Sequence, residues 1–470
     1  MERPNAWKSY SAEEKTAVFS FADGYRNFLS KCKTERECVK EIKRIAMEHG
    51  FRDMADIIRN GESLKAGDRV FADNRGKNLL LYVIGSEDLE KGMNILGAHL
   101  DSPRLDLKQN PLYEDTELAL LDTHYYGGIK KYLWVALPLA IHGVVVKKDG
   151  TVVELSIGEN PNDPVFGISD LLIHLSSELL EKKASKVVEG EALDVLVGSI
   201  PLVKADNTDD NDEKKEIKEA VKASVLSIIK EQYGFEEEDF LSAEIEIVPA
   251  GSARDYGLDR SMIMGYGHDD RSCAWPSFCA MLEIGVPKRT SLCILTEKEE
   301  IGSVSTTGME SRFFENMTAE VMNACGCYSE LKLRRMLENS KVLSSDVNAA
   351  FDPLYPNVME RKNASYLGRG LVISKYTGSR GKVCSNDASA EYMAEIRRIM
   401  DDGKVFYQTA ELGHVDAGGG GTIAYMLGNY NMLVIDAGIA VLNMHAPWEI
   451  ISKADLYEAK RGYVAFLLNA

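Results

Sequence analysis

Two adjacent acids, Glu299 and Glu300, have the side-chain types and spacing for metal and acid–base chemistry. They lie in the stretch TEKEEIGS, directly after an apolar, β-prone run at residues 291–295 that predicts a buried strand. Active sites of open α/β sheets lie just past the carboxyl ends of strands. Neighbouring side chains that leave a strand point in different directions, so one glutamate could bind a metal while the other acts as general base on a metal-bound water. The alternative is a pair of solvated surface acids, because Glu is mostly exposed in proteins.

Further histidines and acids follow other predicted strands or begin predicted helices. His99 follows an expected strand at residues 94–97, although a lone histidine is often structural. Asp269 and Asp270, in GHDDR, precede a helical run, where aspartate is a favoured N-cap, and the same alternative applies to Asp346. The candidate metal ligands are His99, Asp269, Glu300, Asp346 and His445.

Together these candidates form a set of imidazole and carboxylate ligands. Strand ends gather on one edge of an α/β sheet, so we expect these side chains to meet there. Such an N/O set suits a pair of Zn²⁺, Mn²⁺ or Co²⁺ ions, with one carboxylate as a bridge. Glu299 is then a spare acid, able to take a proton from a shared water and pass it to a leaving amine. Asp101, two residues after His99, could orient the imidazole.

Capping signals and apolar spacing predict the elements that position these side chains. Ser11 with Glu14, and Thr34 with Glu37, form capping boxes that begin two helices. Strands follow from residue 69, and helices and strands alternate again from residue 261, which predicts an α/β fold with a mixed β-sheet sandwiched by helices. Strands are expected at residues 70–71, 79–84, 94–97, 291–295, 341–343, 371–374, 405–409 and 432–435, and a helix at residues 388–400.

A stretch without regular strand–helix alternation interrupts this pattern. Its expected elements are strands at residues 134–137, 143–146 and 152–157 and an amphipathic segment at residues 168–180. We therefore expect an inserted β-rich domain at residues 105–250, which divides a catalytic domain into residues 1–104 and 251–470. Within the insertion, the charge-rich residues 206–219 predict a solvated loop that enters a surface helix.

Composition and charge exclude several classes of partner. A net charge of −18 and a pI near 5.1 argue against nucleic acid and anionic membranes, which bind basic surfaces. The N-terminus lacks the apolar core of a signal peptide, and the longest apolar run, residues 132–146, is too short to span a bilayer. The eight cysteines are scattered without a disulfide framework. We therefore expect a cytoplasmic protein that binds neither nucleic acid nor membrane.

A glycine-rich stretch, DAGGGGTIAYML, places Gly418, Gly419 and Gly420 before a helical run. Bare amides there could approach an anion or a substrate backbone, and tight packing is the alternative. The stretch lacks the Lys-Ser/Thr of a phosphate loop and the spacing of a dinucleotide-binding fingerprint.

Five motifs, GAHLDSP, GHDDR, EKEEIGS, SSDVNAA and NMHAPWEI, occur in this order. The ordered set resembles the aspartyl aminopeptidase and vacuolar aminopeptidase family of clan MH zinc metallopeptidases, in its bacterial form, over nearly the whole chain. The resemblance implies a zinc-exopeptidase fold, with Glu299 as the general base and Asp101 as the residue that orients the first histidine. The ligands that it implies are His99 and Asp346 for one zinc, Glu300 and His445 for the other, and Asp269 as the bridge.

The resemblance also implies an assembly and substrate contacts. The insertion matches a dimerisation domain, and His174 matches a histidine that reaches a neighbouring subunit's site and helps stabilise the oxyanion. Family members form tetrahedral dodecamers built from dimers. In acid-preferring relatives a basic residue pairs with the substrate side chain, and Arg380 or Lys382 could do so here, with neutral or basic first residues as alternatives. The glycine-rich stretch is then expected at the substrate pocket.

These observations predict a metal-dependent aminopeptidase that removes the N-terminal residue from peptides. Two divalent ions per subunit are expected, zinc first, with cobalt and manganese as alternatives, and Glu299 is expected as general base on a metal-bridging water. A deacylase or carboxypeptidase of the same fold is one alternative. A non-catalytic, metal-stabilised assembly protein is another, against which the spare acid Glu299 argues.

Overall fold

The computed structural model describes residues 3–203 and 217–470 and divides into two compact units. The first unit consists of Met1–Ser102, Ala253–Met444 and Trp448–Ala470, and the second of Pro103–Ser252 and His445–Pro447. Most of the charge-rich stretch predicted as a solvated loop lies outside the described residues.

The first unit begins with two helices whose starts follow from local sequence. α1 (Ala12–Lys31) and α2 (Glu35–Glu48) both begin with the predicted capping box. In α1, Glu14 N donates to Ser11 Oγ at 3.2 Å and Ser11 N donates to Glu14 Oε2 at 2.7 Å. These bonds satisfy N–H groups that have no partner within the helix, so both predictions are confirmed.

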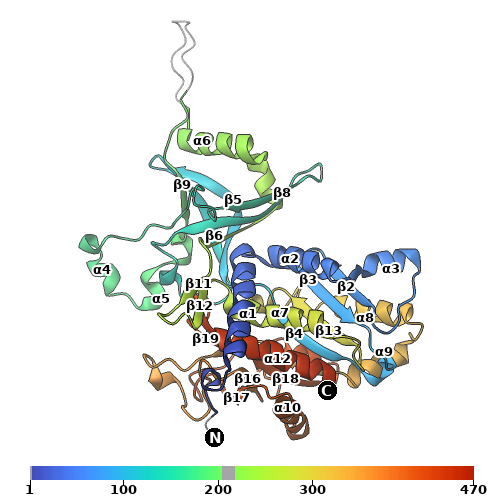
Figure 1. Ribbon diagram of the computed structural model, residues 1–470. Helices are drawn as coiled ribbons and strands as arrows, with labels where there is room; N and C mark the ends of the chain where they lie inside the picture. The colour runs from blue at the N-terminus through green and yellow to red at the C-terminus, as the bar shows by residue number, and fades with distance from the viewer. Residues whose placement is uncertain (1–2, 204–216) are drawn as a thin grey trace, which may run out of the picture. The chain divides into compact units, whose positions relative to one another are not determined.

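A nine-stranded mixed sheet forms the centre of the first unit (Figure 1). Its strands, in sheet order, are β1 (Arg52–Asp53), β2 (Arg69–Asn74), β3 (Asn78–Val83), β13 (Ser291–Thr296), β4 (Asn94–His99), β14 (Lys341–Ser344), β18 (Leu433–Gly438), β16 (Leu371–Ser374) and β17 (Tyr407–Thr409). The four strands β13, β4, β14 and β18 are parallel to one another, and β3 and β16 flank them antiparallel. The predicted α/β class with a mixed sheet is confirmed.

Helices cover both faces of this sheet. The remaining helices of the first unit are α3 (Met54–Asn60), α7 (His268–Glu283), α8 (Phe313–Ala324), α9 (Glu330–Glu338), α10 (Ala390–Asp402), α11 (Ala424–Gly428) and α12 (Lys453–Asn469). Leu79, Leu81 and Val83 pack in one core with α1, α2, α7, α10 and α12, whereas Leu80 and Tyr82 pack in another with α3, α8, α9 and α11. Successive side chains of a strand point to opposite faces, so these strands are apolar throughout. Among the described residues, no helix combines the length and apolar character needed to cross a membrane.

A smaller, five-stranded sheet also belongs to the first unit. Its strands, in sheet order, are β11 (Arg254–Tyr256), β12 (Met262–Gly265), β20 (Glu449–Ser452), β19 (Ala440–Leu442) and β15 (Asn348–Ala349). β12 leads into α7, which carries Asp269, and β15 begins two residues after Asp346. This sheet therefore supports the chain just before Asp269 and just after Asp346, which are two of the candidate ligands.

The second unit is built on a six-stranded antiparallel sheet. Its strands, in sheet order, are β8 (Val152–Ile157), β7 (Leu139–Val146), β10 (Ala243–Pro249), β5 (Arg104–Asp115), β6 (Leu118–Tyr126) and β9 (Val195–Gly198). Its helices are α4 (Ser177–Leu180), α5 (Ala184–Val187) and α6 (Ala220–Ile228). α6 packs against β5, β6 and β9 (Figure 1).

The strand expected at residues 134–137 is absent. These residues follow a 3₁₀ turn (Lys131–Leu133), and β7 begins only at Leu139. Pro138 stands directly before it and has no N–H for a ladder hydrogen bond, so pairing starts one residue later.

The amphipathic segment expected at residues 168–180 does not form one helix. It contains a 3₁₀ turn (Ile173–Leu175) followed by the single turn of α4. Ile173 and Leu175 are 67% and 69% exposed, so these apolar side chains do not pack on a surface of the second unit that would stabilise a longer helix.

Candidate metal centre

Three parallel strands of the central sheet end beside one another. β13 and β14 flank β4, and the last residue of β13 lies in register with His99, the last residue of β4. The chain beyond β13 reaches Glu299 and Glu300, and the chain beyond β14 reaches Asp346. The structure therefore brings candidates from three strand ends to one edge of the sheet, where parallel strands of α/β proteins place their ligands.

Possible ligand atoms crowd together at this edge. Those of His99, Asp269 and Asp346 all lie within 4.8 Å of one another, and so do those of His99, Glu299 and Glu300. His99 and Asp269 are buried, whereas Asp346 and both glutamates are partly exposed. The cluster thus combines buried candidate ligands with partly exposed ones.

Hydrogen bonding determines which nitrogen of His99 could bind a metal. Nδ1 lies 3.0 Å from the carbonyl oxygen of Asp101, and a carbonyl can only accept. Nδ1 is therefore the N–H donor, and Nε2, which lies 3.1 Å from Asp269 Oδ1, is left as the ligand atom.

Backbone contacts at the start of α7 hold Asp269. Its N–H donates to Glu449 Oε2 at 3.1 Å, and its carbonyl accepts from Ser102 Oγ at 2.8 Å. Its neighbour Asp270 accepts from His99 N through Oδ2 at 3.2 Å, so Asp270 ties α7 to the end of β4. Sequence reasoning missed Glu449; the available signal was a single acid in the otherwise apolar start of a strand, EIIS.

Asp101 organises the turn that carries the two glutamates. Its carboxylate accepts from Glu299 N through Oδ1 and from Glu300 N through Oδ2, each at 3.2 Å. Asp101 was expected to orient His99 through its carboxylate, but its carbonyl makes the shorter contact and Oδ1 lies 3.4 Å from Nδ1. The glutamates lie in a 3₁₀ turn (Glu299–Ile301) rather than in extended chain, and Asp101 accepts from N–H groups that the turn itself does not bond.

The electrostatics of the cluster favour a bound cation. Burial raises the pKa of Asp346 well above its usual value, and the charge of Asp270 adds to this. Burial also raises the pKa of Asp270 itself. For His99, burial lowers the pKa, but hydrogen bonds with Asp101 and Asp269 outweigh burial and raise it well above its usual value. A divalent ion would supply the positive charge that these crowded acids otherwise obtain from protons, so the residues fit a metal.

His445 lies between β19 and β20, in a loop grouped with the second unit. Its Nδ1 lies 2.9 Å from the carbonyl oxygen of Gly128, so Nδ1 is the donor and Nε2 is left as the possible ligand atom. Four residues further along the chain stands Glu449, the acceptor of Asp269 N. The ligand role of His445 stays a prediction.

Packing explains part of the glycine-rich stretch. A Cβ on Gly418 would overlap the carbonyl oxygen of Leu412, and a Cβ on Gly419 would overlap that of Gly378. Gly420 has nothing within 4 Å of the place where its Cβ would lie. Of these glycines, Gly420 has the most room for a substrate, and the substrate-binding role stays a prediction for all of them.

The other predicted substrate and oxyanion residues lie on exposed segments. Lys382 Nζ donates to Asp387 at 2.9 Å and lies 3.6 Å from the centre of the Tyr376 ring, so its charge is already engaged. Arg380 is exposed, as is His174 in the second unit. Their predicted roles stay predictions.

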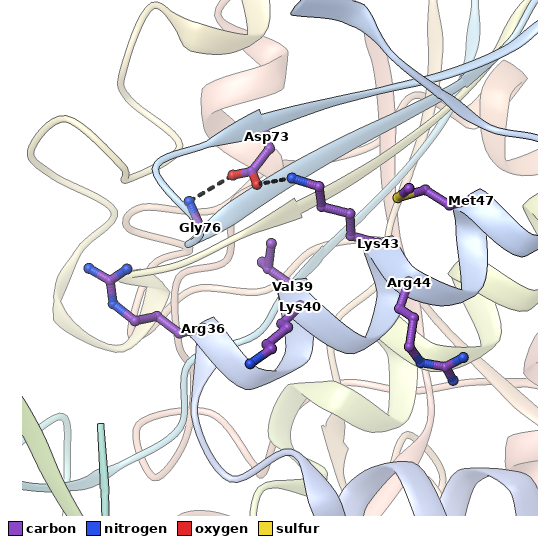
Figure 2. A pocket seen from close by; sticks show the side chains of 8 residues that line it. All are labelled: Arg36, Val39, Lys40, Lys43, Arg44, Met47, Asp73 and Gly76. Atoms are coloured by element: carbon purple, nitrogen blue, oxygen red, sulfur yellow. Dashed lines mark hydrogen bonds and ion pairs between the residues drawn. The ribbon is translucent and has the colours of Figure 1, made fainter. Parts of the chain in front are cut away.

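Several hollows in the described part of the chain lie outside the cluster, among them the following two. One, of about 350 Å³, runs along α2 (Figure 2), where Lys43 pairs with Asp73 at 3.0 Å and Asp73 accepts from Gly76 N at 2.7 Å. The other, of about 270 Å³, lies in the second unit between its sheet and α6 and is lined almost entirely by apolar side chains. Neither is lined by a predicted ligand, so ligand atoms rather than cavity size define the candidate site.

Comparisons with known proteins identify relatives that match along almost the whole chain. A family model described as "Aminopeptidase I zinc metalloprotease (M18)" matches residues 28–467. A Clostridium acetobutylicum protein named "Probable M18 family aminopeptidase 1" is 62% identical over 468 residues, which cover 100% of this chain and 98% of that protein. The crystal structure of an M18 aminopeptidase from Thermotoga maritima has a TM-score of 0.93 at 46% identity and covers 100% of both chains. The S. cerevisiae mApe1 dodecamer structure shares the fold, with a TM-score of 0.75 at 18% identity over 96% of this chain and 97% of that chain.

The family model spans most of the chain, and the clostridial relative matches it from end to end. The resemblance stated from the five motifs is therefore confirmed. The chain belongs to the M18 family of zinc metalloproteases and is a metalloaminopeptidase.

Proposed function

We propose that this metalloaminopeptidase uses two metal ions and that Glu299 is its general base. The observation that carries the proposal is the overlap of two ligand groups at one sheet edge. His99 belongs to both: to the group with Asp269 and Asp346 and to the group with Glu299 and Glu300. With Glu299 set aside as the base and His445 added, the proposed set has five ligands, whereas one tetrahedral zinc takes four.

The proposed ligands divide between the two ions. His99 and Asp346 would hold the first ion, Glu300 and His445 the second, and Asp269 would bridge them. Imidazole and carboxylate ligands suit zinc and also cobalt or manganese. When bound, the ions polarise the scissile carbonyl and lower the pKa of the water that attacks it.

Glu299 is suited to move the proton. Its Oε2 lies 3.9 Å from His99 Nε2, the ligand atom proposed for the first ion, so its carboxylate faces the reacting centre. Adjacent residues of a 3₁₀ turn point about 120° apart, so Glu299 and Glu300 can serve different purposes. Glu299 accepts the proton of the attacking water and donates it to the leaving amine.

We propose that residues 105–250 form a dimerisation domain inserted between catalytic parts 1–104 and 251–470. Support comes from the apolar side chains beside His174: Leu172, Ile173 and Leu175 are 54%, 67% and 69% exposed. A second copy of the chain would bury them. His174 would then donate to the oxyanion in a neighbouring subunit's site.

The larger assembly and the substrate contacts are also part of the proposal. Dimers would form a tetrahedral dodecamer in the cytoplasm, with peptides as substrates. Gly420 and its neighbouring glycines would contact the substrate backbone, and Arg380 or Lys382 its first side chain. Since Lys382 is engaged by Asp387, an acidic first residue would have to displace that contact.

Metal titration combined with a substrate panel tests the proposal. Metal-free protein is titrated with zinc while hydrolysis of aminoacyl anilides, N-blocked analogues and peptides is measured. We expect activity on free amino termini to reach its maximum near two equivalents of zinc.

Other outcomes favour the alternatives. A maximum at one equivalent would remove the second ion from the mechanism. Cleavage of N-blocked substrates instead would favour a deacylase or carboxypeptidase specificity, and full metal occupancy without cleavage would favour an assembly role.

A further inference from the structure

The loop from Glu297 to Gly308 is shaped unusually for a chain that must place two acids accurately. Lys298, directly before the glutamates, has φ of 66°, and Ser303 and Ser305 have φ of 58° and 74°. Non-glycine residues seldom adopt this left-handed conformation, and they keep it only where surrounding contacts impose it. Something must therefore hold Lys298 in place.

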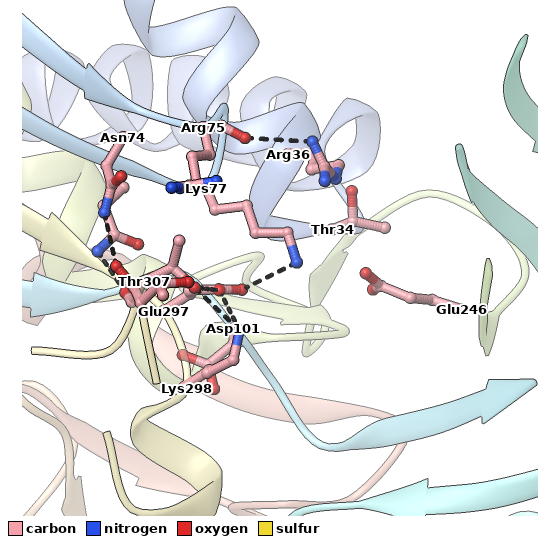
Figure 3. A network of polar contacts seen from close by, with 12 residues as sticks. Thr34, Arg36, Asn74, Arg75, Lys77, Asp101, Glu246, Glu297, Lys298 and Thr307 are labelled. Atoms are coloured by element: carbon pink, nitrogen blue, oxygen red, sulfur yellow. Dashed lines mark hydrogen bonds and ion pairs between the residues drawn. The ribbon is translucent and has the colours of Figure 1, made fainter. Parts of the chain in front are cut away.

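Glu297 supplies the contacts that do so (Figure 3). Its side chain is 1% exposed, and its carboxylate accepts hydrogen bonds from Lys298 Nζ and Thr307 Oγ1. Lys298 Nζ also donates to Thr307 Oγ1 at 3.0 Å, and Lys77 Nζ lies 3.8 Å from Glu297 Oε2. A buried carboxylate thus ties the side chain of Lys298 to the far end of the loop.

The far end of the loop is itself fixed to the central sheet. Asn78 Nδ2, at the start of β3, donates to the carbonyl oxygen of Thr307. Asn74 Nδ2, at the end of β2, donates to the carbonyl oxygen of Thr306 at 3.1 Å (Figure 3). Thr307 is therefore a rigid point of reference for Glu297 and Lys298.

The turn of the two glutamates is thus held by two sets of contacts. Asp101 binds the N–H groups of Glu299 and Glu300, and the Glu297–Lys298–Thr307 cluster sets the backbone of the residue before them. Rotation at Lys298 would turn both acids together, away from the base position and from the ligand position.

We propose that Glu297 is a positioning residue that holds Lys298 in its left-handed conformation and so directs Glu299 and Glu300 to their separate tasks. The inference rests on the proposed roles of those two acids. Glu297 acts through the backbone and touches neither substrate nor metal.

Three variants test the role of Glu297. Glu297→Ala removes the acceptor, and because misplacement by about 1 Å costs about 10²-fold in rate, kcat should fall about 10²-fold with KM little changed. Glu297→Gln keeps an oxygen for Lys298 and Thr307 and should recover most of that loss. Lys298→Met, which removes only the ammonium, should lower kcat in the same direction even if Glu297→Ala folds poorly.

Glu458→Ala is the matched control. Glu458 lies on α12 and is also fully buried. Its carboxylate accepts from Tyr10 Oη at 2.7 Å and from Phe406 N at 2.9 Å, and none of these residues belongs to the candidate metal centre. We expect Glu458→Ala to lower the thermal midpoint without lowering kcat per folded molecule. Equal losses of kcat in Glu297→Ala and Glu458→Ala would reduce Glu297 to a structural residue.

A cobalt readout separates this inference from the proposed function. The absorption spectrum of Co²⁺-substituted protein reports ligand geometry whether or not the protein cleaves peptides. We expect Glu297→Ala to shift the spectrum, because Glu300 moves, and Glu297→Gln to restore it. An unchanged spectrum in Glu297→Ala would overturn the positioning role, whereas an inactive wild type with a shifted variant spectrum would overturn only the proposed catalytic role of Glu299.

Discussion

Replacing Glu299 by glutamine removes its charge while changing little else. The amide has nearly the same size and shape as the carboxylate, and the backbone N–H that donates to Asp101 at 3.2 Å is unaffected. Glu299 is partly exposed, so the substitution leaves no cavity in the core. The expected change in folding free energy is small, within about 0.5 kcal/mol, as for surface substitutions generally.

The expected change in rate is far larger. A positioned general base contributes about 10²–10⁴-fold, which corresponds to about 2.7–5.4 kcal/mol of transition-state free energy. Glutamine cannot take the proton, so Glu299→Gln should lose most of that factor in kcat. The rise in activation free energy should therefore be several times larger than any change in the free energy of folding.

The assay pairs kcat with metal content, and Glu300→Gln is the control. Glu299→Gln should keep both ions and lose turnover, whereas Glu300→Gln should weaken one metal site by about tenfold or more. Hydrolysis of an aminoacyl anilide and elemental analysis after dialysis measure the two effects. If both variants lost metal equally, or if Glu299→Gln kept its turnover, the division of labour between these neighbours would be wrong.

Further expectations concern pH, metal removal and assembly. Burial raises the pKa of Asp455 to about 8, so the folded protein holds a proton that the unfolded chain releases above about pH 4. The contribution of Asp455 to the free energy of unfolding should therefore fall as the pH rises from about 4 to about 8. In denaturant titrations at several pH values, Asp455→Asn should make the free energy of unfolding depend less on pH over this range. An unchanged pH dependence would contradict the burial argument. Chelation should abolish activity and lower the thermal midpoint, with zinc restoring both, because a ligand at 100 times its Kd stabilises by about 2.7 kcal/mol per site; a midpoint indifferent to chelation would argue against ions in the folded cluster. His174→Ala should lower kcat about 10²–10³-fold with metal content intact, and full activity of that variant would remove His174 from the mechanism.

Sequence predicted best those features that depend on neighbouring residues or on a repeating pattern. The capping boxes of Ser11 and Thr34 depend on residues three positions apart, so composition and spacing identify them. The central strands have continuous apolar runs because both their faces are buried, and this pattern located β4, β13 and β14. Once the strands were located, the gathering of His99, Glu299 and Asp346 followed from sheet geometry.

Features that depend on distant partners could not be predicted. The contacts that hold Glu297 involve Lys77, in the turn between β2 and β3, and Thr307, in a loop, and no local pattern marks a charged residue for partners so far along the chain. The carboxylate of Asp101 accepts from two backbone N–H groups, and this pairing depends on the 3₁₀ turn that the chain forms at residues 299–301. Residues 168–180 have apolar side chains at helical spacing, but spacing alone does not show whether another part of the protein packs against those side chains.

The division of the first unit along the chain has a consequence during synthesis. The chain leaves this unit at Ser102 and returns at Ala253, so β4 leaves the ribosome before both of its neighbours, β13 and β14. The six strands of the second unit's sheet lie between those points, so all of them have been synthesised before β13 and β14, the neighbours of β4. Domains fold as units during synthesis, and β4 exposes apolar Ile95 and Leu96 until its neighbours arrive. A nascent chain therefore cannot bring His99, Glu300 and Asp346 together until Asp346 has emerged, and the proposed ligand His445 emerges later still. Peptide hydrolysis should accordingly be one of the last properties that the growing polypeptide acquires.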